Sequence, residues 1–174
     1  MYDFIIRTRT RVDAGELEKK LHESPENSIS FYIMDWRDEY YNSSPEAEKI
    51  MYMYLAICDS SNPGRGIRVY GYDDRINVEF KFQSSRDEIP VLQAVVGALL
   101  ELTGEEKIKH YPANGSEIIT FREFKNFYNY EWYDKQFKAT NESAMVFFAS
   151  MCNKPDSEYY MFTADGLKKG SKIH

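Results

Sequence analysis

The sequence predicts an α+β fold, in which a mostly antiparallel β-sheet meander of about five to seven strands carries two main helices packed on one face. Alternating apolar runs joined by short polar links favour antiparallel hairpins. One long apolar helix, 89–102, is suited to cover the sheet. Alternating strand–helix–strand units, which are typical of a parallel doubly wound sheet, do not occur. The 174 residues suit one domain, 1–174.

The N-terminal part predicts two strands around a short helix. Leu17 and Leu21, four residues apart, are the expected core positions of that helix. Alternation of apolar and polar residues indicates the second strand. The expected order is a strand over 4–10, a helix between the N-cap Asp13 and the closing Ser24-Pro25, and a strand over 28–36.

Residues 45–58 leave two interpretations open. Pro45, directly after two serines, is typical of a helix start. The following residues are rich in aromatic and branched side chains, and Met51, Met53 and Leu55 alternate with their neighbours. This alternation favours a strand from Lys49.

The clearest local signal is a β-hairpin over 67–82 about the polar pivot 73–75. The loop before it, 62–66, contains glycines, but no helix start follows, so a turn is expected there and not a phosphate-binding loop. The buried helix 89–102 should begin at a capping box over 85–88, or slightly later at Asp87 with Pro90, and end at Gly104.

The rest of the chain predicts short elements. They are, in order, a strand over 107–111, a hairpin turn at 113–115, a strand over 117–124, an aromatic segment at 127–132, a polar loop over 133–143, a buried strand or helix over 144–149, a strand over 159–162 and a frayed tail at 168–174.

Charge and composition exclude several classes of protein. The formal net charge is −6, with 28 acidic against 22 basic residues, which argues against a nucleic-acid binder because phosphate binding needs clustered Lys and Arg. Cys58 and Cys152 are too few for a disulfide framework and are expected to be reduced. No apolar run approaches the roughly 20 residues of a membrane helix, and the N-terminus lacks the pattern of a signal peptide. A cytoplasmic protein without a membrane partner is predicted.

No motif indicates catalysis, a metal or a cofactor. His22, His110 and His174 lack the local spacing of metal ligands, and no serine or cysteine context marks a nucleophile. We therefore expect His110 at the surface or at a strand edge. Nearby carboxylates occur at 35–39 and 73–74, but Asp and Glu are common in turns and alternate here with arginines. They are interpreted as solvated turn residues.

The aromatic content is high, with 14 Tyr, 11 Phe and 2 Trp. About half of these rings fall in alternating strands, where a sheet face explains them. The others concentrate at 36–41 and 127–133, beside acidic residues. Tyr and Trp are enriched at protein interfaces, whereas base stacking needs basic neighbours. Two interpretations stay open: cover for the sheet, or a protein-binding surface.

A family resemblance rests on two segments. The apolar run 91–104 ends in Thr103-Gly104, and after a short strand comes Asn-Gly-Ser-Glu-Ile-Ile-Thr-Phe-Arg at 114–122. This pattern resembles the SitI-type immunity proteins that bacteria carry against contact-delivered toxins. The opening strand and helix, 2–21, look similar too, and the likeness covers 2–21 and 76–132, while 37–66 departs from it. The resemblance implies a non-enzymatic toxin–antitoxin partner that occludes a basic toxin, and it carries over no catalytic residue.

The leading hypothesis is therefore an immunity-type protein that binds a basic toxin through an acidic, Tyr/Trp-rich surface. The alternative is a small-ligand-binding or hydrolytic domain with a pocket between the sheet and helix 89–102, with His110, Glu117 and Arg122 as its polar groups. A homo-oligomer subunit without chemistry of its own is a third possibility. The expected partner-binding residues are Trp36, Asp38, Glu39, Tyr40, Tyr41, Asp73 and Asp74.

Overall fold

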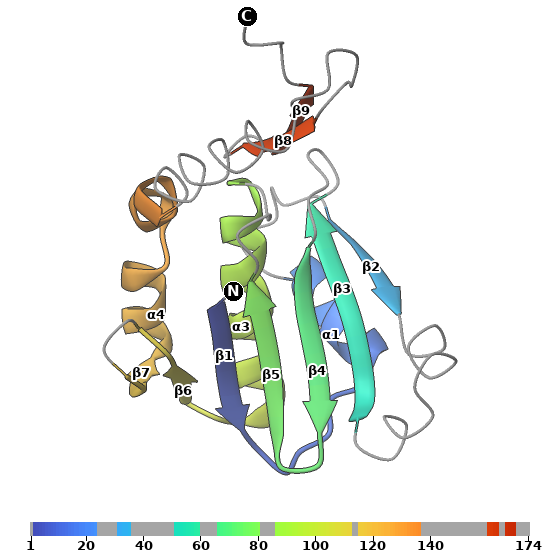
Figure 1. The fold of residues 1–174 in the computed structure, drawn as a ribbon. Helices are drawn as coiled ribbons and strands as arrows, with labels where there is room; N and C mark the ends of the chain where they lie inside the picture. The colour runs from blue at the N-terminus through green and yellow to red at the C-terminus, as the bar shows by residue number, and fades with distance from the viewer. Residues whose placement is uncertain are drawn as a thin grey trace, which may run out of the picture.

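The main element of the computed structural model is an antiparallel sheet of seven strands in the order β2-β3-β4-β5-β1-β6-β7. The described residues are 2–23, 31–35, 51–59, 66–80, 86–112, 115–136, 160–163 and 166–169. The strands of the sheet are β1 (Tyr2–Arg7), β2 (Phe31–Asp35), β3 (Met51–Asp59), β4 (Ile67–Tyr72), β5 (Arg75–Phe80), β6 (Lys107–His110) and β7 (Glu117–Thr120). The main helices are α1 (Ala14–Glu23), α3 (Glu88–Thr103) and α4 (Phe121–Phe127) (Figure 1).

The predicted α+β class is confirmed. The strand order departs from a simple meander at one strand, β1. Strands β2 to β5 follow one another across the sheet, but β1 lies between β5 and β6. Phe4 of β1 therefore pairs with Val78 on one side and with His110 on the other. Local hairpin signals could not reveal this arrangement, because it joins three distant parts of the chain.

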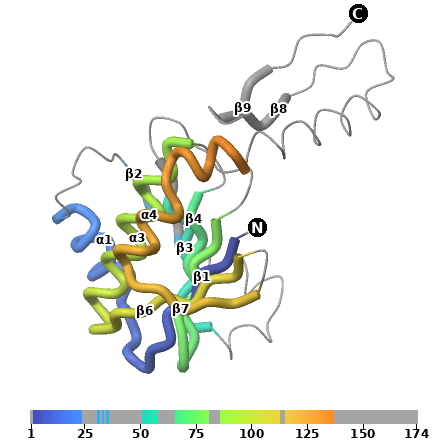
Figure 2. Tube along the Cα trace, turned by 90° about the vertical axis from the view of Figure 1, so that its left-hand side faces the viewer, coloured from blue at the N-terminus to red at the C-terminus, as the bar shows by residue number. Residues whose placement is uncertain are grey.

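The three helices lie on one face of the sheet (Figure 2). Helix α3 is the centre of the core, and Leu92, Val95, Val96 and Leu99 are fully buried. Leu17 and Leu21 of α1 are buried as expected. At these positions, the helical spacing of apolar residues predicts the packing correctly.

Several predicted elements are confirmed. Residues 51–59 form a strand, and residues 73–74 form the turn between β4 and β5. The Asp13 carboxylate accepts hydrogen bonds from the amides of Gly15 and Glu16, as an N-cap does. Gly104 closes α3 in the left-handed conformation, with φ of 71°.

Other expectations were wrong. The strand predicted over 117–124 ends at Thr120, whose hydroxyl forms a capping box with Glu123 and begins α4. Residues 130–136 are helical, although the sequence indicated a loop from 133 onward. Of the two starts expected for α3, the later one is confirmed: Asp87 is the N-cap, without a side-chain capping bond, and Glu88 is buried in the core. Ser85, the first residue of the alternative capping box, lies outside the described residues.

A second, two-stranded sheet pairs β8 (Tyr160–Thr163) with β9 (Gly166–Lys169). The strand expected over 159–162 is present with slightly shifted bounds. Lys168 and Lys169, which the sequence assigned to a frayed tail, are the last residues of β9. The expectations for 144–149 and for the rest of the tail lie outside the described residues.

Candidate protein-binding surface

The predicted contact residues Asp73 and Asp74 lie at the exposed β4–β5 turn. A guanidinium nitrogen of Arg11 bonds the Asp73 carboxylate, and Arg75 contacts Asp74 at 2.9 Å. Each carboxylate thus has a cationic neighbour, which offsets the negative charge that would attract a basic partner. The other predicted contacts lie outside the described residues, and they stay a prediction: Trp36, Asp38, Glu39, Tyr40 and Tyr41.

His110 is buried, contrary to the expectation of a surface or strand-edge residue. Its side chain is 1% exposed, because His110 pairs with Phe4 across the sheet and shares the helix-covered face with Ile108. The alternation of Ile108 and His110 along β6 is the signal that would have placed it inside.

The contacts of His110 hold its ring in the core. Its Nδ1 shares a hydrogen bond of 2.7 Å with the Tyr128 hydroxyl, and burial raises the pKa of that phenol. Its Nε2 lies 3.6 Å from a Glu117 carboxylate oxygen. Buried in this way, His110 is a core residue.

The three polar groups of the alternative function do not form one site. His110 and Glu117 face each other across β6 and β7, but Arg122 is exposed on α4, and no contact places it with the other two. The buried imidazole offers no surface to a substrate. Within the described residues, no group of three His, Cys, Asp or Glu side chains could hold a metal ion.

The sheet face opposite the helices carries a different set of side chains. Residues paired directly across antiparallel strands project from the same face, so the pairing registers define transverse rows. The central row crosses six strands and contains Tyr54, Tyr70, Asn77, Ile5, Lys109 and Ile118. A row on one side contains Ala56, Arg68, Glu79 and Asp3, and a row on the other contains Met51, Tyr72, Arg75 and Arg7.

We call these rows, with Lys107 and Tyr111 at their β6 end, the outer face. Figure 1 looks onto it, with α1 and α3 behind the strands. The neighbouring rows that contain Leu55, Val69 and Val78 project to the opposite side and are buried in the core. The two faces are thus chemically distinct, one aliphatic and one rich in Tyr and Arg.

A polar network organises the β3–β5 part of the outer face. The rings of Tyr54 and Tyr70 stack with centroids 4.7 Å apart. Arg68 donates to the Tyr54 hydroxyl at 2.6 Å, and the Tyr70 hydroxyl donates to Glu79 at 3.0 Å. Burial, with the nearby Glu79 carboxylate second, raises the pKa of the Tyr70 phenol. These contacts hold large side chains in fixed positions on the sheet.

The β6–β7 part of the outer face exposes apolar groups. Ile118 is 67% exposed and Tyr111 47% exposed. Lys109 lies between these two residues. Its ammonium is 5.1 Å from the centre of the Tyr111 ring, and the residue pairs with Ile118 across the strands. Two large exposed hydrophobic residues around one cation resemble the mixed chemistry of protein interfaces.

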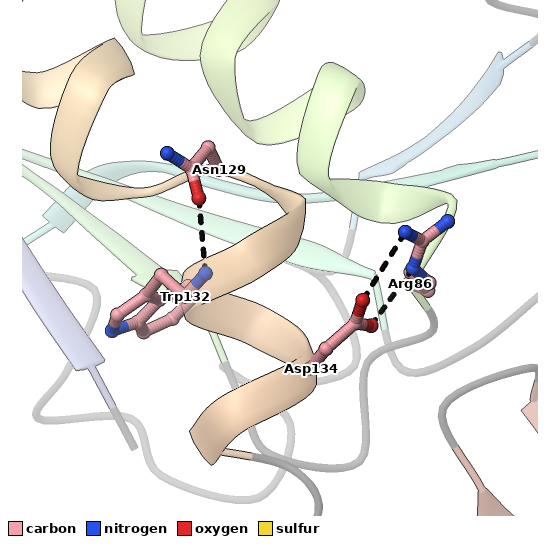
Figure 3. A network of polar contacts seen from close by, with 4 residues as sticks. All are labelled: Arg86, Asn129, Trp132 and Asp134. Carbon is pink, nitrogen blue, oxygen red and sulfur yellow. Dashed lines mark hydrogen bonds and ion pairs between the residues drawn. The ribbon is translucent and has the colours of Figure 1, made fainter.

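The aromatic segment 127–133 divides between core and surface. Tyr128 and Tyr133 are buried, and Trp132 packs edge-on against Tyr2, so the sheet-cover interpretation holds for these three. Of the aromatic residues in this segment, only Phe127 and Tyr130 are exposed. Asn129 accepts a hydrogen bond from the Trp132 amide and begins the turn of helix that carries these rings (Figure 3).

An ion pair fastens the same helix to the start of α3. Arg86 contacts Asp134 through two nitrogens, at 2.8 and 3.2 Å (Figure 3), and lies 4.3 Å from the centre of the Tyr130 ring. Bonding to Asp134 raises the pKa of the arginine. Tyr130 thus has a structural contact, and this side of the molecule is less suited to bind a partner than the outer face.

None of the described helices is both long enough and apolar enough to span a membrane. Comparisons of the chain with protein-family models, with curated proteins and with solved structures found no match.

Proposed function

We propose that the protein is a non-enzymatic, immunity-type protein that binds a toxin through the outer face of its sheet and thereby occludes it. The proposal includes a cytoplasmic location, where such a protein would meet its target. The resemblance to SitI-type immunity proteins supports the class. The side chains of the outer face support the binding role.

The observation that carries the proposal is the composition of the central row. Tyr54, Tyr70, Ile5 and Ile118 form a line across the sheet with Asn77 and Lys109. Tyr and Arg are enriched at binding hot spots because they combine large contact area with directed polar groups. In this row Tyr54 is buried, Tyr70 and Ile5 are half-buried, and Ile118 is exposed. The row thus joins tyrosine side chains to exposed apolar surface at its β7 end, a combination that is common in interface cores.

Co-purification with the toxin encoded beside the gene tests the proposal. The wild-type protein should bind it with a dissociation constant below about 1 μM, which corresponds to roughly −8 kcal/mol. Ile118→Asp places a charge in the outer face and should weaken binding at least tenfold. Tyr130→Asp is the matched control, because Tyr130 is 41% exposed on the helix side, and it should bind as the wild type does.

Two results would contradict the proposal. One is the absence of binding by any neighbouring toxin at micromolar concentration. The other is a loss of affinity in Tyr130→Asp with none in Ile118→Asp, at unchanged thermal stability of both variants.

A further inference from the structure

We infer that the outer face recognises an acidic protein surface. The inference rests on the proposed function and specifies the partner. It departs from the basic toxin that the sequence indicates, because the charge of this face differs in sign from the charge of the whole chain.

The described strands place five cations on the outer face and only two carboxylates. Asp3 and Glu79 are the carboxylates, and Arg7, Arg68, Arg75, Lys107 and Lys109 are the cations. Adding the turn residue Asp74, which pairs with Arg75, still leaves an excess of positive charge. The whole chain has a net charge of −6. An acidic partner would therefore be attracted to this face and repelled from the rest of the molecule.

The centre of the face adds one requirement to the partner. Ile5 is half-buried and Ile118 is exposed, so they offer apolar contact area and the partner needs apolar groups between its acidic ones. Apolar groups among carboxylates are a feature of a protein surface.

The aromatic side chains do not suit a nucleic acid, the other polyanion. Bases need exposed ring faces for stacking, but Tyr54 and Tyr70 stack on each other and the Arg75 guanidinium covers Tyr72 at 4.4 Å. Tyr111 is the exposed ring of the face, and the Lys109 ammonium lies 5.1 Å from its centre. The face thus offers cations for carboxylates, while the tyrosines of β3 and β4 offer no free ring face for bases.

Titration of the isotope-labelled protein with defined polymers tests the inference by NMR. The probes are poly-L-glutamate, poly-L-lysine and oligothymidylate at low salt. Poly-L-glutamate should shift the amides of β1, β5 and β6 and leave those of α1 unchanged. Oligothymidylate should bind more weakly, and poly-L-lysine should leave the outer face unchanged.

A pair of matched double variants locates the binding. Arg7→Glu with Lys109→Glu reverses two charges on the outer face and should weaken poly-L-glutamate binding at least tenfold. Lys19→Glu with Lys135→Glu reverses two charges on exposed helical residues and should change it less than twofold. Far-ultraviolet circular dichroism and thermal melting check that both variants stay folded.

Failure of the inference is separable from failure of the proposed function. No binding of poly-L-glutamate, tighter binding of oligothymidylate, or equal losses in the two double variants would overturn the acidic partner. A toxin that binds the wild-type protein and the Arg7→Glu, Lys109→Glu variant equally well would also overturn it, while leaving the immunity function standing.

Discussion

At the scale of single residues, two buried polar side chains connect distant parts of the core. His110 on β6 shares a hydrogen bond with the hydroxyl of Tyr128, which follows α4. Glu88, fully buried at the start of α3, accepts a hydrogen bond of 3.0 Å from the amide of Gly66. The first turn of a helix favours a carboxylate through the exposed amides and the helix dipole. Neither residue is explained by apolar patterning alone.

The Tyr128 hydroxyl should contribute to stability and to its dependence on pH. Tyr128→Phe leaves a buried imidazole nitrogen without its hydrogen-bond partner, so we expect a loss of about 1–3 kcal/mol in the free energy of unfolding at pH 7. Urea denaturation measures this loss. Retention of full stability would show that the bond contributes nothing.

At alkaline pH, the free energy of unfolding of Tyr128→Phe should come closer to that of the wild type. Burial raises the pKa of Tyr128 in the folded protein, whereas the unfolded chain ionises near pH 10. The stability from this difference is therefore complete below about pH 10 and is lost as the pH rises further. Phenylalanine cannot ionise, so the difference in the free energy of unfolding between wild type and variant should narrow as the pH rises above about 10. A difference that widens above pH 10 contradicts the raised pKa of Tyr128.

Glu88→Ala should be costly because it leaves the Gly66 amide, which donates to Glu88 in the core, without its acceptor. We expect a loss of about 1–3 kcal/mol in the free energy of unfolding. Glu101→Ala is the matched control, since Glu101 lies on the same helix but is exposed and pairs with Lys20 at the surface. Comparable losses in the two variants, measured by urea denaturation, would disprove the role of Glu88 as a core anchor.

At the scale of elements, predictions from the sequence succeed where one periodic pattern runs to a clear boundary. The β4–β5 hairpin has alternation on both sides of a polar turn, and α3 has a wide apolar stripe closed by Gly104. The segment 117–124 is different, because its alternation continues past the residue where the chain changes from strand to helix. Thr120 and Glu123 form a Ser/Thr-x-x-Glu signature, and that signal outweighs the strand pattern.

The capping box at Thr120 should determine whether α4 forms at its observed start. The Thr120 hydroxyl accepts a hydrogen bond from the Glu123 amide. The Glu123 carboxylate accepts a hydrogen bond of 2.7 Å from the Thr120 amide. Thr120→Ala should lower stability by about 0.5–2 kcal/mol, whereas Ser116→Ala, an exposed hydroxyl just before the strand, should change it little. Thermal melting of the two variants compares them, and equal melting temperatures would contradict this role.

At the scale of the whole molecule, the aromatic residues lie on both faces of the seven-stranded sheet. Tyr2, Phe4 and Phe80 pack with Phe124, Tyr128 and Trp132 on the helix side, and Tyr54, Tyr70 and Tyr72 occupy the outer face. Composition cannot separate these groups, because the separation depends on β1 lying between β5 and β6. The outer-face rows were therefore not predictable from the sequence, although the alternation within each strand was.

The charge asymmetry also appears only at this scale. Arg7, Arg75 and Lys109 are far apart in the sequence, and each has an acidic residue within four positions along the chain. Strand pairing brings them to one face. The net charge of −6 thus says little about the surface that a partner would meet.

The central claim is that the outer face is the binding surface. Hydroxyl-radical footprinting of the protein alone and bound to its toxin tests this most directly, because it reports the solvent exposure of individual side chains. Tyr111 and Ile118 on the outer face, and Phe127 and Tyr130 on the helix side, are the large hydrophobic residues that the described surface exposes. We predict that the complex protects Tyr111 and Ile118 from oxidation and leaves Phe127 and Tyr130 as reactive as before. Protection of Phe127 and Tyr130, with Tyr111 and Ile118 still oxidised, would contradict the account.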